Sequence, residues 1–236
     1  MKNQAGDSSV IKVPQLARIP FLWHGFGDLS WGEKDLRQLA ESLGFRPLFL
    51  KQVHADVVHF IAEVPQRTLR GDAAVTRLPG LLLAIKTADC LPVVLVEEKR
   101  RVIAAVHCGW KGTSQRVLEK VVLGMKEHFG ADPAAILAGF GPCIGGGCYE
   151  VGEDVRRTFV ESDFPTSLFR PITGHSGKYL LDLRSANRLQ LLKSGIKANH
   201  IFSLDICTHC DPKFPSYRRD RDATRRMLTF IGLTAS

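Results

Sequence analysis

Two histidines and one cysteine each follow a short apolar run in this sequence. They are His54 in LKQVHADVV, Cys90 in IKTADCLPVVL and His107 in VIAAVHCGW. Runs of this kind are typical of buried strands, so we expect the three side chains to meet at one rim of a sheet. Two imidazoles and a thiolate, with a fourth position left open, are typical of a catalytic zinc site. The sequence therefore predicts one zinc ion bound by these three residues.

The spacing of the three residues favours ligands from separate strands. Separations of 36 residues from His54 to Cys90, and of 17 from Cys90 to His107, match no zinc-finger pattern. Taken alone, each residue is also explained as an ordinary histidine or a packed core thiol. Two neighbours, Asp89 and Gln52, are predicted to handle protons or to orient a reactant beside the ion.

The segment HCGWKGT, which begins at His107, leads into a predicted helix. Backbone N–H groups, the helix dipole and a lysine favour an anion at such a place, so Lys111 and Thr113 are predicted to bind phosphate. The motif alone is weak, because many strand-to-helix turns are glycine-rich. Arg218 is a further candidate for the phosphate, although a solvated surface arginine is the commoner outcome.

Four other cysteines suggest a second interpretation. Cys143 and Cys148 lie in GPCIGGGCYEV, and Cys207 and Cys210 lie in CTHC, so the four together resemble a structural zinc knuckle. The first pair is spaced more widely than zinc sites prefer, and Cys143 lies in a Pro/Gly turn that needs only a small side chain. The sequence leaves a knuckle and a set of unligated thiols both open.

Composition limits the class of protein. The chain has 236 residues, of which 44% are hydrophobic, and no apolar stretch long enough to span a membrane. Its N-terminus lacks the apolar core of a signal peptide, and six cysteines are too sparse for a disulfide scaffold. We therefore expect a soluble cytoplasmic protein with reduced thiols and no membrane partner.

The net charge of +8 admits an anionic partner. Residues 216–226, SYRRDRDATRR, hold five arginines against two aspartates, but basic residues are not spread along a face with aromatic residues between them. A nucleic-acid partner is therefore disfavoured. A small molecule that carries phosphate, or simple solubility, explains the charge better.

Hydrophobic periodicity predicts a mixed α/β fold. Helices are expected over residues 33–43, 113–129, 153–162 and 183–193. Strands are expected over residues 47–53, 57–62, 73–76, 81–86, 92–96, 101–106, 135–139, 201–204 and 227–231. Because these elements do not alternate strictly, we expect a single three-layer α/β/α domain with a mixed central sheet. Residues 1–12 are expected to form a flexible tail, and residues 13–236 the domain.

Seven segments in order resemble the laccase-domain family, also called the multicopper polyphenol oxidase-like or purine nucleoside phosphorylase family. They are KQVH, DAAVT, TADCLP, HCGWKGT, GPCIGGGCYEV, LDLRSAN and SYRRD. The resemblance implies a laccase-like catalytic domain whose metal is held by His54, Cys90 and His107. It also implies cleavage of purine nucleosides by phosphate, with adenosine deaminase and methylthioadenosine phosphorylase activity, and an older label of copper-dependent phenol oxidase.

The chain departs from the family pattern in two places. The family follows HGF with a Thr-Arg pair and two glycines, whereas this chain reads HGFGDLSWG, with Gly27 or Asp28 where an arginine is expected. The family's C-terminal TGR corresponds here to Thr224, Arg225 and Arg226. Phosphate handling or the choice of substrate is expected to differ accordingly.

The sequence is compatible with several functions. The resemblance favours a zinc-dependent purine nucleoside phosphorylase acting on adenosine, inosine or guanosine. A true multicopper oxidase is disfavoured because the eight histidines include no His-x-His pair, although copper can occupy the same ligands in vitro. A metal-free hydrolase or deamidase would use Cys90 as the nucleophile and His107 or His54 as the base. The non-enzymatic alternative is a metal-stabilised protein that binds a partner. The oligomeric state stays open.

Overall fold

The computed structural model describes residues 10–234. Residues 1–9 of the predicted flexible tail lie outside this range. Within the rest of the tail, Val10–Ile11 form strand β1. Within the described range, no helix combines the length and apolar character needed to cross a membrane.

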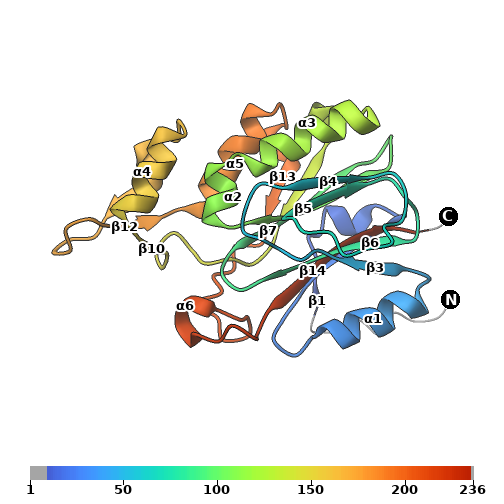
Figure 1. Cartoon of the computed structure of the whole chain (residues 1–236), viewed down its shortest axis with the longest axis horizontal. Coiled ribbons are helices and arrows are strands. Elements are labelled where there is room, and N and C mark those ends of the chain that lie inside the picture. Colours follow the sequence, from blue (N-terminus) through green and yellow to red (C-terminus); the bar gives the residue numbers. More distant parts are fainter. Residues whose placement is uncertain (1–9, 235–236) are drawn as a thin grey trace.

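Most strands belong to two large mixed sheets (Figure 1). In order across the first sheet, the strands are β1, β2 (Leu22–Gly27), β14 (Met227–Leu233), β6 (Leu81–Thr87) and β3 (Arg46–Phe49). In order across the second, they are β13 (Ile201–Ser203), β9 (Leu137–Phe140), β7 (Leu91–Glu97), β8 (Val102–Cys108), β5 (Ala73–Thr76) and β4 (Val58–Ile61). A small third sheet contains β10 (Glu150–Gly152), β12 (Lys178–Leu181) and β11 (Phe169–Pro171).

The described residues form six α-helices, most of which lie on the outer faces of these sheets (Figure 1). They are α1 (Glu33–Ser42), α2 (Trp110–Ser114), α3 (Val117–Phe129), α4 (Glu153–Glu161), α5 (Leu183–Lys193) and α6 (Tyr217–Asp220). Helix α6 instead lies in the connection between β13 and β14. Short 3-10 turns cover Leu16–Arg18, Pro133–Ala135, Thr166–Leu168 and Ala198–His200.

The two large sheets pack face to face around a shared apolar core. Leu83 and Ile85 of β6 belong to the same buried cluster as Val94 and Val96 of β7 and Ile103 of β8. The opposite face of the six-stranded sheet is covered by α3 and α5, and that of the five-stranded sheet by α1. Strands β7 and β8 are therefore buried on both faces, and this burial explains why their sequences are continuous apolar runs.

The predicted α/β class, with mixed sheets and helices outside them, is confirmed. The single central sheet of the predicted three-layer arrangement is divided into two, however. Strands β6 and β7 are consecutive, but the chain crosses from one sheet to the other in the short connection between them, which contains Asp89 and Cys90. The assignment of residues 13–236 to one domain stays a prediction, and the core shared by the two sheets supports it.

The helix expected over residues 113–129 is two helices, α2 and α3. Arg116 separates them in the left-handed region, with φ of 64°. The break exposes backbone groups that the side chain of Gln190 on α5 satisfies: its amide nitrogen donates to the Thr113 carbonyl (3.2 Å), and its oxygen accepts from the Leu118 N–H (3.2 Å). A residue distant in the sequence therefore stabilises a helix boundary that local periodicity does not reveal.

Candidate metal centre

The three residues predicted to bind a metal come from three different elements. His54 lies in the loop after β3 with φ of 55°, Cys90 lies in the connection from β6 to β7, and His107 lies near the end of β8, opposite Pro92 of β7. One ligand atom from each side chain lies within 4.8 Å of the others. The two imidazole rings have centroids 4.8 Å apart and stand nearly perpendicular, at 84°.

Asp72, which precedes β5, fixes two of these side chains and was missed by the sequence analysis. Its fully buried carboxylate accepts hydrogen bonds from the backbone N–H of His54 (3.0 Å), the N–H of Ala55 (2.9 Å) and Nδ1 of His107 (2.8 Å). Because Nδ1 of His107 donates to this carboxylate, its Nε2 is left as the ligand atom. Asp72 is the first residue of DAAVT, one of the seven segments that resemble the family, and this membership was the sequence signal that could have identified it.

Gly109 lies against two of the three candidate ligand side chains. A Cβ atom built at this position would lie 3.1 Å from Sγ of Cys90 and 3.6 Å from Nε2 of His107. Sγ and Nε2 therefore face the same small space beside the backbone of Gly109. Its φ of −75° is ordinary for any residue, so space and not backbone conformation favours glycine here. The nitrogen and sulfur donors and this space fit a zinc ion.

The thiol and the buried imidazole perturb each other. Burial alone would raise the pKa of Cys90, but the charge of His107 and hydrogen bonds with His107 and His54 lower it to about 6. Burial acts to lower the pKa of His107, but the charge of Cys90 and the hydrogen bond with Asp72 raise it to about 9. Between these values, Cys90 is a thiolate and His107 is an imidazolium when no metal is bound.

The structure gives Asp89 and Gln52 positioning contacts. The Asp89 carboxylate accepts from the Thr208 hydroxyl (2.7 Å) and from the backbone N–H of Arg218 (2.6 Å). The Gln52 amide pairs with the backbone of Lys86, donating to its carbonyl and accepting from its N–H, both at 2.8 Å. These contacts hold the loops that carry Cys90 and His54, and they favour positioning over the predicted proton handling.

Thr113 lies in the core. Its side chain is fully buried, its hydroxyl accepts from the Asn187 amide (3.0 Å), and its backbone N–H donates to the Gly109 carbonyl (2.9 Å). The position therefore does not support phosphate binding by Thr113. Lys111 is exposed, and its ammonium lies 5.6 Å from the centroid of the Trp110 ring, so it remains available to an anion.

Arg218 lies beside an aromatic ring that the sequence analysis did not single out. Its guanidinium donates to the Glu150 carbonyl (2.8 Å) and lies 5.3 Å from the centroid of the Tyr149 ring. Burial, together with the charge of Cys90, raises the pKa of Tyr149. Because the Arg218 backbone N–H donates to Asp89, the residue before Cys90, Arg218 and the Tyr149 ring lie near the Cys90 loop.

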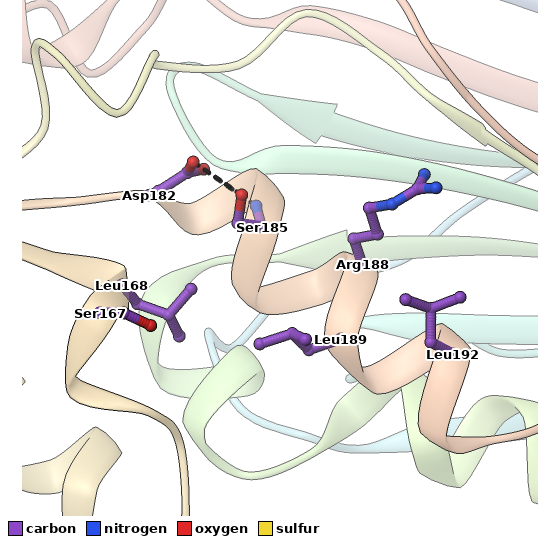
Figure 2. A pocket seen from close by; sticks show the side chains of 7 residues that line it. All are labelled: Ser167, Leu168, Asp182, Ser185, Arg188, Leu189 and Leu192. Atoms are coloured by element: carbon purple, nitrogen blue, oxygen red, sulfur yellow. Dashed lines mark hydrogen bonds between the residues drawn. The ribbon is translucent and has the colours of Figure 1, made fainter. Parts of the chain in front are cut away.

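A separate surface pocket lies on α5 (Figure 2). Its lining residues are Ser167, Leu168, Asp182, Ser185, Arg188, Leu189 and Leu192. The Asp182 carboxylate caps α5 by accepting from the Ser185 N–H (2.9 Å) and hydroxyl (2.7 Å). None of the predicted site residues lines this pocket, so it is not part of the candidate metal centre.

The fold agrees with comparisons to known proteins. A family model described as "Multi-copper polyphenol oxidoreductase laccase" matches residues 30–234. The chain belongs to this family. "Purine nucleoside phosphorylase YfiH" of Escherichia coli (strain K12) is 38% identical to this family member over 195 residues, covering 82% of this chain and 76% of that protein. "Purine nucleoside phosphorylase" of Deinococcus radiodurans is 42% identical over 202 residues, covering 83% of this chain and 75% of that protein.

A solved structure has the same fold as this family member. The crystal structure of YlmD from Geobacillus stearothermophilus superimposes with a TM-score of 0.82 at 29% sequence identity, covering 92% of this chain and 93% of that one.

Gly27 and Asp28, at one of which the resemblance implies an arginine, are both held in local contacts. A Cβ atom at Gly27 would lie 2.9 Å from the Trp31 ring, which is buried in the core on the α1 side. Next to it, the Asp28 carboxylate accepts from the N–H (2.8 Å) and hydroxyl (2.6 Å) of Ser30. A larger side chain at position 27 would require Trp31 to move.

Proposed function

We propose that this chain is a zinc-dependent purine nucleoside phosphorylase. Its substrates would be adenosine, inosine and guanosine, with methylthioadenosine as a further candidate, and adenosine deamination would be a side activity. The convergence of His54, Cys90 and His107 within 4.8 Å carries this proposal. The names of the relatives at 38% and 42% identity support the choice of purine nucleosides and phosphate.

In this proposal His54, Cys90 and His107 hold one zinc ion, and copper is a competing ion in vitro. When bound, such an ion acts as a Lewis acid and lowers the pKa of a coordinated water to about 7. Asp72 keeps His107 in the tautomer that presents Nε2, and Gly109 keeps the space beside Sγ of Cys90 open.

Phosphorolysis requires that phosphate attack the ribose carbon while the purine leaves with the bonding electrons. We assign Lys111 and Arg218 to the phosphate, because both are cations on segments that adjoin the site. The Tyr149 ring, beside Arg218, offers an apolar face to the purine. Asp89 and Gln52 act by holding the loops that carry the ligands.

The proposal includes a cytoplasmic location, where the six free cysteines remain reduced. Its partners are a purine nucleoside and phosphate, without nucleic acid or a membrane. No oligomeric state is assigned.

The test is incubation of protein of known zinc content with adenosine, inosine and guanosine, with and without phosphate. The expected products are the free base and ribose 1-phosphate, formed only when phosphate is present. Inosine from adenosine without phosphate would report the deaminase side activity. If no nucleoside is consumed by zinc-loaded protein, the proposal is wrong.

One observation favours a second candidate, a metal-free cysteine hydrolase or deamidase. Asp72, His107 and Cys90 form a chain in which the carboxylate orients the imidazole and the imidazole faces the thiol, as in enzymes with a cysteine nucleophile. Metal-free protein that remains active and is inhibited by thiol alkylation would favour this candidate. Activity that disappears with the metal and returns with it would favour zinc.

A further inference from the structure

Three cysteines outside the candidate metal centre also converge. Cys148 precedes β10, and Cys207 and Cys210 follow β13. Their sulfur atoms all lie within 4.8 Å of one another, and those of Cys148 and Cys210 are 3.4 Å apart. All three are free thiols. Segments separated by about sixty residues therefore bring three soft ligands to one point.

Backbone contacts hold the two segments together, and one of them is directed at a cysteine sulfur. Cys143 and Cys207 form an isolated parallel bridge, in which the Cys143 N–H donates to the Ile206 carbonyl (3.3 Å) and the Thr208 N–H donates to the Cys143 carbonyl (3.1 Å). The Gly145 N–H donates to Sγ of Cys207 (3.1 Å). An N–H aimed at a sulfur atom stabilises a thiolate, which is the form that binds metals.

The CTHC turn has the spacing and shape of half a structural metal site. Two residues separate Cys207 from Cys210, and the N–H groups of Cys210 and Asp211 both donate to the Cys207 carbonyl (3.2 and 3.0 Å). This turn places both sulfur atoms on the same side as Cys148. Cys143 does not join them: its buried sulfur instead accepts from the Arg184 guanidinium (3.4 Å). Of the four cysteines that the sequence offered for a knuckle, the structure thus brings three together.

We propose that Cys148, Cys207 and Cys210 bind a second, thiophilic metal ion, either Zn²⁺ or Cu⁺. A tetrahedral ion with metal–sulfur bonds of about 2.3 Å places its sulfur ligands about 3.8 Å apart. The sulfur atoms of Cys148 and Cys210 are 3.4 Å apart, and each pair among the three sulfur atoms is separated by at most 4.8 Å. The observed separations therefore agree with this value. Soft thiolates select these two ions. Cys210 is exposed, so a solvent molecule completes the coordination of Zn²⁺, whereas Cu⁺ needs only the three sulfurs.

The second site supports the loop that adjoins the first. Thr208, which lies between Cys207 and Cys210, donates its hydroxyl to Asp89, the residue before Cys90. The Arg219 guanidinium donates to the carbonyls of Thr208 (2.7 Å) and His209 (3.2 Å) on the same turn. An ion bound to the turn therefore stabilises the position of Asp89. The second site does not depend on the proposed phosphorylase function.

Metal counting on full-length protein, purified without oxygen and with a reductant, tests the second site. The Cys90→Ser variant removes the first site. One sample of it is loaded with Zn²⁺ and another with Cu⁺, and weakly bound ions are then removed from both. We expect Cys90→Ser to retain one ion per chain and Cys90→Ser/Cys210→Ser to retain none. The matched control is Cys90→Ser/Cys143→Ser, which changes a neighbouring thiol outside the group and should retain the ion.

X-ray absorption spectroscopy of the metal-loaded Cys90→Ser protein gives a second measurement. It requires no substitution at Cys148, Cys207 or Cys210, so it does not depend on whether such a variant folds. We expect three sulfur neighbours at about 2.3 Å for zinc, and three somewhat closer ones for copper. The proposal is overturned if Cys90→Ser retains neither ion, if retention is unchanged by Cys210→Ser, or if fewer than three sulfurs surround the metal. A Cys148–Cys210 disulfide in the reduced preparation would also overturn it.

Discussion

At the scale of single residues, Asp72 links the two histidines of the candidate metal centre. It orients His107 through Nδ1 and holds the backbone of the His54 loop. Partners of this kind raise the basicity of a metal-binding imidazole and fix its direction. The position of both imidazoles therefore depends on a carboxylate that does not itself belong to the ligand group.

We expect Asp72→Asn to weaken zinc binding by about 10- to 100-fold. The amide removes the charge beside His107 and cannot accept all three hydrogen bonds. A chelator competition titration measures the affinity. Asp132→Asn is the control, because Asp132 is an exposed N-cap that asparagine replaces well. Equal affinity in wild type and Asp72→Asn would contradict the role assigned to this carboxylate.

The pKa values of Cys90 and His107 predict how alkylation depends on pH in metal-free protein. Only the thiolate reacts, so the rate at Cys90 should rise through about pH 6 and be flat above about pH 7. His107→Ala removes the main neighbouring charge, so the midpoint should move upward toward the ordinary thiol value of about 8.5. Peptide mass spectrometry separates Cys90 from the other thiols. A wild-type midpoint near the ordinary value would show that the ion pair does not form.

At the scale of elements, α2 packs closely against the His54 loop. A Cβ atom at Gly112 of α2 would lie 2.6 Å from the Ala55 carbonyl oxygen, a backbone atom that Asp72 holds in place through the Ala55 N–H. Helix α2 also follows directly from β8, which carries His107. The glycine therefore sets the distance between two ligand-bearing segments.

We expect Gly112→Ala to lower the free energy of unfolding by about 1–3 kcal/mol, because overpacking against the backbone outweighs the better helix propensity of alanine. Zinc affinity should fall as well, since the His54 loop must move. Urea unfolding and zinc titration measure the two effects. Gly147→Ala is the control, because nothing lies within 4 Å of a Cβ atom there. An unchanged zinc affinity in Gly112→Ala would indicate that this contact does not position His54.

The sequence predicts elements well where local signals suffice. Helix α5 covers residues 183–193 as expected, because Asp182 caps it through the Ser185 N–H. The division of residues 113–129 into α2 and α3 could not be predicted, because the broken backbone is satisfied by Gln190 from α5. The membership of each strand in one of the two large sheets could not be predicted either, because an apolar run does not indicate which sheet its strand joins.

At the scale of the whole molecule, the candidate metal centre forms where the chain passes between the two large sheets. Cys90 lies on that crossing, while His107 lies near the end of a strand of the six-stranded sheet and His54 follows a strand of the five-stranded sheet. The convergence of these three side chains could be predicted because each follows an apolar run. Asp72 could not be assigned a role, because its importance comes from contacts with residues that only the fold brings near.

The central claim is that one zinc ion held by His54, Cys90 and His107 is required for nucleoside phosphorolysis. The most direct test measures zinc content and the rate of phosphate-dependent base release together, in wild type and in the His54→Ala, Cys90→Ala and His107→Ala variants. The account predicts that each substitution removes one zinc ion per chain and abolishes base release, while the fold, checked by circular dichroism, is kept. Base release at the wild-type rate by variants that lack this ion would contradict it.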